Sequence, residues 1–211
     1  MTVKELVKRY PSIKPVEDDI LKACGVLISS FFLKNKLLIC GNGGSAADCE
    51  HISGELLKGF LKRRPLNKEL RNALRKKFRK DGNYLASNLQ EGFPAIPLVS
   101  FSSLLTAFSN DVNPSLAFAQ LVNVLGKKGD VLLCISTSGK SRNIIYAAQM
   151  AKAKHLTTIA LTGRGGGQLK AICDVVIDIP GNSTHAIQEL HLPVYHAICT
   201  EIERQLIKRS R

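Results

Sequence analysis

Two polar residues, four positions apart on one predicted helix, could carry acid–base or metal chemistry. His51 and Glu55 follow the glycine-rich segment Gly41–Ser45, and residues at i and i+4 of a helix project from the same face. The apolar run Leu37–Cys40 precedes the glycines and predicts a buried strand that ends in a turn. Glycines let the backbone approach a ligand, Ser45 is placed to cap the next helix, and free N–H groups at a helix start bind anions. These features together predict an enzyme that acts on a small phosphorylated molecule.

A second loop, rich in hydroxyl groups, follows another apolar run. Residues 136–141 read Ser-Thr-Ser-Gly-Lys-Ser and come directly after Asp130–Ile135. Hydroxyl and backbone N–H groups at a helix start suit a phosphate monoester, although Ser and Thr also cap ordinary helices. The chain has neither the order of a nucleotide P-loop nor the G-x-G-x-x-G of a dinucleotide site. The interpretation is therefore a sugar phosphate site without a nucleotide cofactor.

The last predicted helix, at about residues 184–208, supplies two further candidates. Gln188 and His196 are eight residues apart, so they lie near one face after just over two turns. His191 lies off that line. A histidine on a mostly apolar helix often serves only packing. The case for a chemical role of His196 therefore depends on the other candidate residues and not on its own position.

Composition narrows the class of protein. The chain has 211 residues, 45% of them hydrophobic, which is enough for one good core. No run approaches the roughly 20 apolar residues of a membrane helix, and the N-terminal residues lack the apolar core of a secretory signal. The six cysteines form no C-x-x-C pair and lie mostly in apolar segments, which predicts packed thiols in a reducing compartment. We expect a cytoplasmic globular protein with no membrane partner.

The positive charge is concentrated in one segment. Of the net charge of +13, ten basic and two acidic residues between Lys62 and Asp81 contribute +8. Such a segment could bind nucleic acid. That function is disfavoured here, because the segment has few interleaved aromatic residues beyond Phe78 and Tyr84.

A basic insert occupies about residues 60–90. Apolar residues recur every four positions in it, which predicts an amphipathic helix that Asp81-Gly82 would end. The insert could cap a site, change substrate choice, build a subunit interface, or be a solvated basic helix packed through its apolar stripe. The stripe consists of Leu66, Leu70, Leu74 and Phe78.

Predicted strands alternate with predicted helices along the rest of the chain. Strands are expected at about 36–40, 95–100, 130–135, 157–161 and 175–179. This alternation predicts an α/β three-layer sandwich, with a central parallel sheet of about five strands flanked by helices and the helical insert after the second helix. Ligands bind at the carboxyl ends of strands in such sheets, where both loops lie. Without a long linker or repeat, we expect one domain over residues 1–211, with an N-terminal helical segment at 1–35.

These motifs, in this order, resemble the sugar isomerase (SIS) domain family, and within it the phosphoheptose isomerase branch. The resemblance covers nearly the whole chain and implies a SIS or flavodoxin-like fold. It also implies an enzyme of carbohydrate metabolism, an intramolecular oxidoreductase. Such an aldose–ketose isomerase converts sedoheptulose 7-phosphate to D-glycero-D-manno-heptose 7-phosphate through an enediol, for heptose and glycan precursors. The matching positions are Gly41–Ser45 with Asp48, His51 and Glu55; Asn110-Asp111; Ser136–Gly139 with Ser141; and Gln188-Glu189 through His191 to His196.

The resemblance implies roles for individual residues. Glu55 is implied as the base and His196 as its acid–base partner. One zinc ion per subunit is implied at His51, Glu55, Gln188 and His196, and this role of Glu55 competes with its role as the base. The family is similarly expected to form a homotetramer with active sites between subunits. Phosphate contacts are implied at Ser45, Ser136, Ser138 and Ser141, and sugar contacts at Asn42, Gly43, Gly44, Glu55, Asn110, Asp111, Thr137 and Gln188.

One alternative function stays open. A non-catalytic SIS protein could bind a phosphosugar, or act as an adaptor for a replication initiator. The basic insert favours this alternative. The presence of His51, Glu55, Gln188 and His196 disfavours it, because an adaptor has no need of that set.

Overall fold

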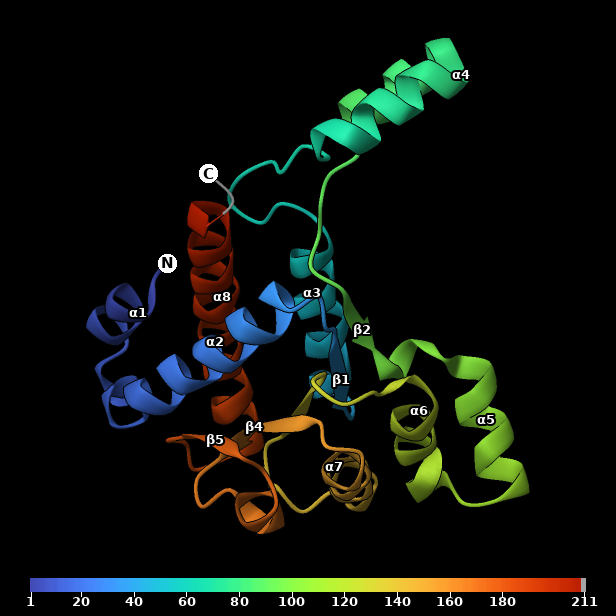
Figure 1. Ribbon diagram of the computed structural model, residues 1–211. Helices are drawn as coiled ribbons and strands as arrows, with labels where there is room; N and C mark the ends of the chain where they lie inside the picture. The colour runs from blue at the N-terminus through green and yellow to red at the C-terminus, as the bar shows by residue number, and fades with distance from the viewer. Residues whose placement is uncertain (210–211) are drawn as a thin grey trace.

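The computed structural model, which describes residues 1–209, has a parallel five-stranded sheet between two layers of helices (Figure 1). The strand order is β2-β1-β3-β4-β5, and every neighbouring pair is parallel. This is the order 2-1-3-4-5 of flavodoxin-like sheets, so the predicted α/β three-layer fold is confirmed. The strands are β1 (Leu37–Gly41), β2 (Ala95–Pro97), β3 (Val131–Ser136), β4 (Thr157–Gly163) and β5 (Val175–Ile179).

The two faces of the sheet support two separate hydrophobic cores. Along β1, Leu37 and Ile39 belong to one core, whereas Leu38 and Cys40 belong to the other. Successive side chains of a strand point to opposite faces, so a strand covered on both sides must be apolar throughout. This explains why the apolar runs of β1 and β3 predicted strands correctly.

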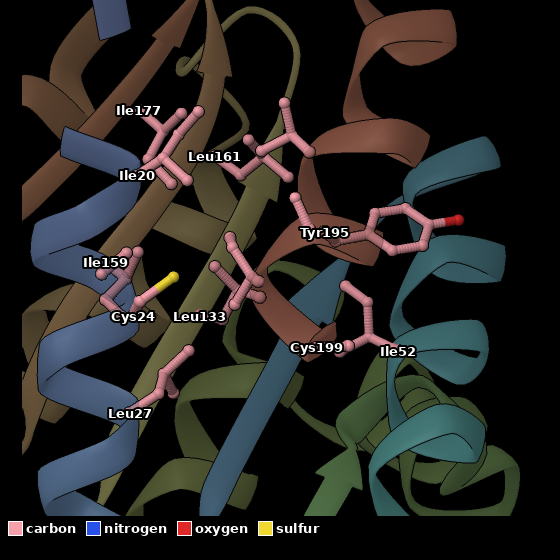
Figure 2. Close-up of a cluster of buried hydrophobic side chains, with 14 of the residues drawn as sticks. Ile20, Cys24, Leu27, Ile52, Leu133, Ile159, Leu161, Ile177, Tyr195 and Cys199 are labelled. Atoms are coloured by element: carbon pink, nitrogen blue, oxygen red, sulfur yellow. The ribbon is translucent and has the colours of Figure 1, made fainter. Parts of the chain in front are cut away.

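Helices α1 (Val3–Arg9), α2 (Glu17–Phe32), α3 (Gly44–Leu57) and α8 (Thr184–Arg209) contribute to the first core (Figure 1). Figure 2 shows part of this core, where side chains of α2 and α8 meet those of the central strands. Helices α6 (Ala117–Leu125) and α7 (Arg142–Ala153) cover the other face. Within residues 1–209, no helix combines the length and apolar character that crossing a lipid bilayer requires. The 3₁₀ turns are η1 (Pro11–Val16), η2 (Leu98–Ser100), η3 (Pro114–Leu116) and η4 (Gly167–Ala171).

Two boundaries differ from the predictions. Helix α1 was not expected as a separate element, so the insert follows the third helix of the chain and not the second. Strand β2 ends at Pro97, and the next three residues form η2 where the strand was expected to continue to Ser100. Proline has no N–H to donate to a strand ladder, and β2 is an edge strand.

The insert forms a helical hairpin that extends away from the sheet (Figure 1). Helix α4 (Lys68–Asn88) contains a break at Arg79, whose φ of 46° and ψ of −110° are not helical. The predicted end at Asp81-Gly82 is therefore wrong, because the chain turns earlier and a second arm follows. Gly82 serves another purpose: a Cβ there would lie 1.9 Å from the Leu74 carbonyl oxygen, so only glycine lets the two arms approach.

The apolar stripe of the insert is only partly covered. Leu66 is buried, whereas Leu70 and Phe78 are 45% and 50% exposed. At the base of the hairpin, Pro65 and Gln90 form an antiparallel bridge. The chain therefore leaves and re-enters the body of the protein at neighbouring points.

Candidate active site

Three side chains from two distant parts of the sequence converge at one place. His51 Nε2 on α3 lies 3.4 Å from Glu55 Oε1, one helical turn further along. The same nitrogen lies 3.4 Å from Nε2 of His196, which α8 supplies. The two imidazole rings meet edge to face, with centroids 5.0 Å apart. The structure therefore brings together His51, Glu55 and His196 from the expected set.

Tyr195 joins this group, although the sequence analysis did not select it. Its hydroxyl donates to Asp48 Oδ1 at 3.2 Å and contacts His51 Nδ1 at 3.0 Å. The ring is only 2% exposed. An aromatic residue in an apolar stretch of a helix is ordinarily read as core, and the sole available signal was its position next to His196.

Burial and charge set the protonation of the group. Partial burial lowers the pKa of His196, the nearby His51 lowers it further, and Glu55 acts in the opposite direction. His196 is therefore neutral at neutral pH, with one nitrogen to donate and one to accept. Burial raises the pKa of Tyr195, so its phenol stays protonated. The other oxygen of Glu55 pairs with Lys58 Nζ at 3.1 Å.

The first glycine-rich loop begins α3 in a different way from the prediction. Gly43, with φ of +56°, is the N-cap residue and no side chain caps the helix, so the expected cap at Ser45 is wrong. Ser45 is instead buried within the first turn, and its backbone N–H donates to the Asn42 carbonyl at 3.0 Å. A positive φ favours glycine, which accounts for Gly43.

The second loop is folded tightly over the end of β3. Ser136 Oγ donates to Ser141 Oγ at 3.3 Å, and the Gly139 N–H donates to the Ser136 carbonyl at 3.0 Å. Gly139 has φ of +60°, and a Cβ there would lie 2.0 Å from the Gly166 carbonyl oxygen. The loop after β4 therefore supports the hydroxyl-rich loop from outside.

Side-chain amides connect the two loops with each other and with α8. Asn42 and Asn143 exchange two hydrogen bonds, at 3.0 and 2.9 Å, between the first loop and the first turn of α7. Gln188 lies against the first loop, because a Cβ on Gly44 would be 2.6 Å from Gln188 Nε2. Asn143 was missed by the sequence analysis, since nothing about an asparagine in the first turn of a helix reveals a partner 101 residues away.

Two expected sugar contacts lie apart from this group. Asn110 and Asp111 are exposed at the end of α5 (Ser102–Asp111), and the Asn110 amide donates to Asp111 Oδ1 at 2.9 Å. Among the described residues, no side-chain hydrogen bond or ion pair joins them to the two loops or to His196.

The donor atoms fit zinc in type and only partly in arrangement. Tetrahedral zinc with ligands at 2.0–2.1 Å separates its donor atoms by about 3.3 Å, close to the two separations of 3.4 Å around His51 Nε2. Within residues 1–209, however, His, Cys, Asp and Glu do not assemble into a group of three or more that could hold a metal ion. The fourth expected ligand, Gln188, lies against Gly44.

The class of protein follows from the fold and from comparison with known families. The SIS domain family matches residues 94–163, and this match, with the sheet order and the two loops at the carboxyl ends of β1 and β3, makes the chain a SIS-domain protein. The phosphoheptose isomerase of Burkholderia pseudomallei (strain 1710b) is 37% identical over 191 residues, which are 90% of this chain and 84% of that protein.

Solved structures extend the likeness to three dimensions. The phosphoheptose isomerase of Neisseria gonorrhoeae has a TM-score of 0.75 at 31% identity and covers 95% of this chain and 94% of its own. That of Francisella tularensis has a TM-score of 0.73 at 28% identity, covering 97% and 100%. The chain belongs to the phosphoheptose isomerase family.

Proposed function

We propose that the protein is an aldose–ketose isomerase of carbohydrate metabolism that converts sedoheptulose 7-phosphate to D-glycero-D-manno-heptose 7-phosphate for glycan precursors. One observation carries the proposal: in a chain of this family, His196 of α8 lies 3.4 Å from His51 of α3, which itself lies 3.4 Å from Glu55. The same two helices meet the first glycine-rich loop, since Gln188 lies against Gly44. Acid–base groups and a phosphate-binding loop are thus held by the same pair of elements.

The reaction moves one proton between carbons and one between oxygens. Glu55 removes a proton from C1 of the ketose, and the C–H electron pair forms the C1–C2 double bond. His196 donates a proton to the C2 carbonyl oxygen as the enediol forms, and then takes the proton from the C1 hydroxyl. Glu55 returns its proton to C2, so both residues end as they began. A neutral histidine suits this step, because it carries one donor and one acceptor nitrogen.

We place the substrate across the two loops. Its phosphate is assigned to the hydroxyl groups of Ser45, Ser136, Ser138 and Ser141, and its sugar to Asn42, Gly43, Gly44, Glu55, Thr137 and Gln188. The bond between Ser136 and Ser141 and the Asn42–Asn143 pair support this placement, because they hold the loops in fixed positions. Fixed donors bind an anion without the entropy cost of ordering a loop.

Asn110 and Asp111 are assigned to the sugar site of an assembled homotetramer, with sites between subunits. Helix α5, which carries them, has no buried residue although it contains Leu104, Leu105 and Phe108. A helix of this kind is suited to a subunit contact. We further propose a single domain over residues 1–211 that works in the cytoplasm, which the six free cysteines support.

Zinc is proposed at His51, Glu55, Gln188 and His196, where it would polarise substrate oxygens. The test is metal analysis of the purified protein by mass spectrometry. We expect about one zinc per chain in the wild type and clearly less in His51→Ala. A fully active wild type without stoichiometric zinc would exclude this role.

Two substitutions test the catalytic assignment. Glu55→Gln and His196→Ala should each lower kcat on sedoheptulose 7-phosphate by about 10² to 10⁴-fold, the usual range for loss of a general acid or base. The matched control is Glu50→Gln on the same helix, whose carboxylate is exposed and accepts from Ser100. Circular dichroism should show the same fold in all variants.

The results of these assays distinguish the isomerase from the non-catalytic SIS protein. Full activity in both variants would refute the roles of Glu55 and His196. A wild type that binds the sugar phosphate without converting it, with or without added zinc, would support the non-catalytic alternative.

A further inference from the structure

The end of the helical hairpin that lies farthest from the sheet consists almost entirely of cations. Residues 75–80, called the tip from here on, surround the break at Arg79 where α4 turns back toward the body (Figure 1). All six side chains are exposed. One is Phe78, and the other five are basic: Arg75, Lys76, Lys77, Arg79 and Lys80. The proposed isomerase chemistry uses none of them, so the tip needs an explanation of its own.

The charges of the tip oppose the folding of an isolated chain. Within residues 1–209, none of the five cations forms an ion pair with a carboxylate. Like charges gathered in one place repel each other and destabilise a compact structure. The same charges become favourable when the tip faces a negatively charged surface. The tip is therefore suited to an anionic partner.

The hairpin also presents apolar side chains to solvent. Phe78 is 50% exposed in the middle of the tip, and Lys77 Nζ lies 5.4 Å from the centre of its ring. On the second arm, Leu85 and the C-cap residue Leu89 are 36% and 49% exposed. The two arms pack against each other without covering these side chains. A partner that fits the hairpin must therefore accept apolar groups beside the positive charge.

Two kinds of partner fit this combination poorly. A second copy of the chain offers no opposite charge, because the +8 of residues 62–81 still leaves +5 on the rest of the chain. A nucleic acid has phosphates, but single-stranded bases are held by stacking on successive aromatic rings, and the hairpin contains only Phe78 and Tyr84. A nucleic acid also offers no apolar interior to Leu85 and Leu89.

An anionic lipid bilayer presents both kinds of group at one surface. Its charged headgroups lie above the acyl chains, and helices that combine Lys and Arg with Phe or Leu bind at that boundary. We propose that the tip docks the protein on an anionic membrane surface, with its five cations at the headgroups and Phe78 inserted between them. Because the hairpin extends away from the sheet, the tip can touch a flat surface while the body stays clear of it (Figure 1). This inference departs from the expected absence of a membrane partner, which rested on the lack of a spanning segment.

Vesicle binding of the full chain tests the proposal. Phosphatidylcholine vesicles, with and without one quarter phosphatidylglycerol, are sedimented together with the protein over a range of salt concentrations. Two variants each remove one property of the tip. Lys76→Gln combined with Lys77→Gln removes two charges, whereas Phe78→Ser removes the ring. Both change only exposed side chains, so circular dichroism and the isomerase assay should give the wild-type result.

Each variant has a matched control elsewhere on the surface. Lys127→Gln combined with Lys128→Gln removes the same charge from two exposed neighbours before β3. Leu33→Ser removes an apolar side chain that is 68% exposed at the end of α2. We expect both controls to bind the vesicles as the wild type does.

The wild type should bind only the vesicles that contain phosphatidylglycerol, and added salt should weaken this binding because it screens surface charge. Each cation lost near such a surface lowers affinity by about fivefold. The double lysine variant should therefore bind about 25-fold more weakly, with a smaller salt dependence. Phe78→Ser should weaken binding by about tenfold, as expected when a half-exposed ring loses its apolar environment, and should keep the salt dependence.

Three results would overturn the inference: binding to neither kind of vesicle, equal binding with and without phosphatidylglycerol, or tip variants that bind like their controls. A wild type that binds a single-stranded RNA oligonucleotide but not the vesicles would identify a nucleic acid as the partner and would equally overturn it. The result does not depend on the isomerase assay. An inactive wild type that sediments with anionic vesicles would refute the proposed function and leave the membrane contact standing.

Discussion

His191 shows how a histidine close to the site can serve the fold alone. It is fully buried on α8, its Nε2 faces the Thr162 carbonyl at 3.4 Å, and among the described residues its Nδ1 has no partner. Burial lowers the pKa of His191 to about 4. The side chain is therefore neutral in the folded protein at any pH at which the enzyme is expected to work.

This burial predicts a pH-dependent stability. An unfolded histidine has a pKa of about 6.5, so between pH 6.5 and 4 the unfolded chain binds a proton that the folded chain does not. The free energy of unfolding should therefore fall as the pH falls through this window, by up to about 3 kcal/mol from this group. Urea denaturation of the wild type and His191→Gln at several pH values measures the effect.

The comparison needs a histidine that is not buried. His155→Asn is the control, because His155 is exposed and asparagine tolerates its φ of +60°. The control should lose stability in acid as the wild type does, while His191→Gln should lose less. Equal slopes for all three proteins would contradict a buried neutral His191.

At the residue scale, the spacing of neighbouring residues predicted which side chains share a face. Contacts between residues far apart in the sequence could not be predicted. The separation of His51 from Glu55 predicted a shared face, because helix geometry alone determines it. The contacts of Tyr195 span 144 and 147 residues, and only the folded chain defines them. The cap at Ser45 was mispredicted because Gly43 can adopt the positive φ that ends the loop without any side-chain cap.

Among the elements, the connection between α3 and the hairpin is fixed beside the site. Glu203 of α8 accepts from the backbone N–H groups of Phe60 at 3.0 Å and Leu61 at 2.7 Å. Arg64, also buried, lies 3.9 Å from the same carboxylate. The Phe60 ring in turn lies 5.6 Å from the His196 ring, centroid to centroid. The start of the insert is thus held against α8 next to the proposed acid–base group.

The Glu203 carboxylate anchors the start of the insert to α8, so its removal should lower the free energy of unfolding. Glu203→Ala would leave Arg64 buried without its counter-charge and two amides without an acceptor, so we expect a loss of about 3–5 kcal/mol in the free energy of unfolding. Glu201→Ala is the control, because Glu201 pairs with Arg204 only near the surface and should cost less than about 1 kcal/mol. Similar values from chemical denaturation of the two variants would contradict the anchor.

The hairpin itself should be dispensable for chemistry. Replacing residues 66–89 by a short Gly-Ser linker joins two points that the Pro65–Gln90 bridge already holds together. We expect the shortened chain to fold and to keep kcat within about threefold, because Phe60, the residue of the insert whose ring lies beside His196, comes before the excised segment. Circular dichroism and the isomerase assay measure this, and a large loss of kcat would show instead that the hairpin caps the site.

Elements buried on two faces were predicted well. The apolar runs of β1 and β3 predicted the ends of both strands to within one residue, because burial on both sides leaves no polar alternative. The hairpin was mispredicted because Asp81-Gly82 is an ordinary turn signal. Here Gly82 serves close packing against Leu74, and the turn falls at Arg79, a residue type that gives no sign of a positive φ.

At the scale of the whole molecule, the exposed apolar residues of α5 and its neighbours predict assembly. Phe101 and Val112, which directly precede and follow the helix in sequence, are 37% and 59% exposed. We expect native mass spectrometry and light scattering to give about 92 kDa, four chains of 23.1 kDa. A monomer with full activity would contradict the proposal that subunits complete each other's sites.

The fold class was predictable at this scale, because alternating strands and helices favour a parallel sheet covered by helices on both faces. The pairing of α8 with α3 followed only from the family resemblance. It depends on packing between the two ends of the chain, which no local pattern encodes.

That pairing has a consequence for how the protein is made. His51 and His196 are separated by 145 residues, so the two side chains cannot meet until α8 has left the ribosome. At roughly 5–20 residues per second, the half containing His51 and Glu55 waits about 7 to 30 s for its partner. During that time the growing chain contains every glycine of the first loop but has no isomerase activity. The contact between α3 and α8 therefore forms only when α8 docks, and the proposed assembly of subunits must follow before the sites are complete.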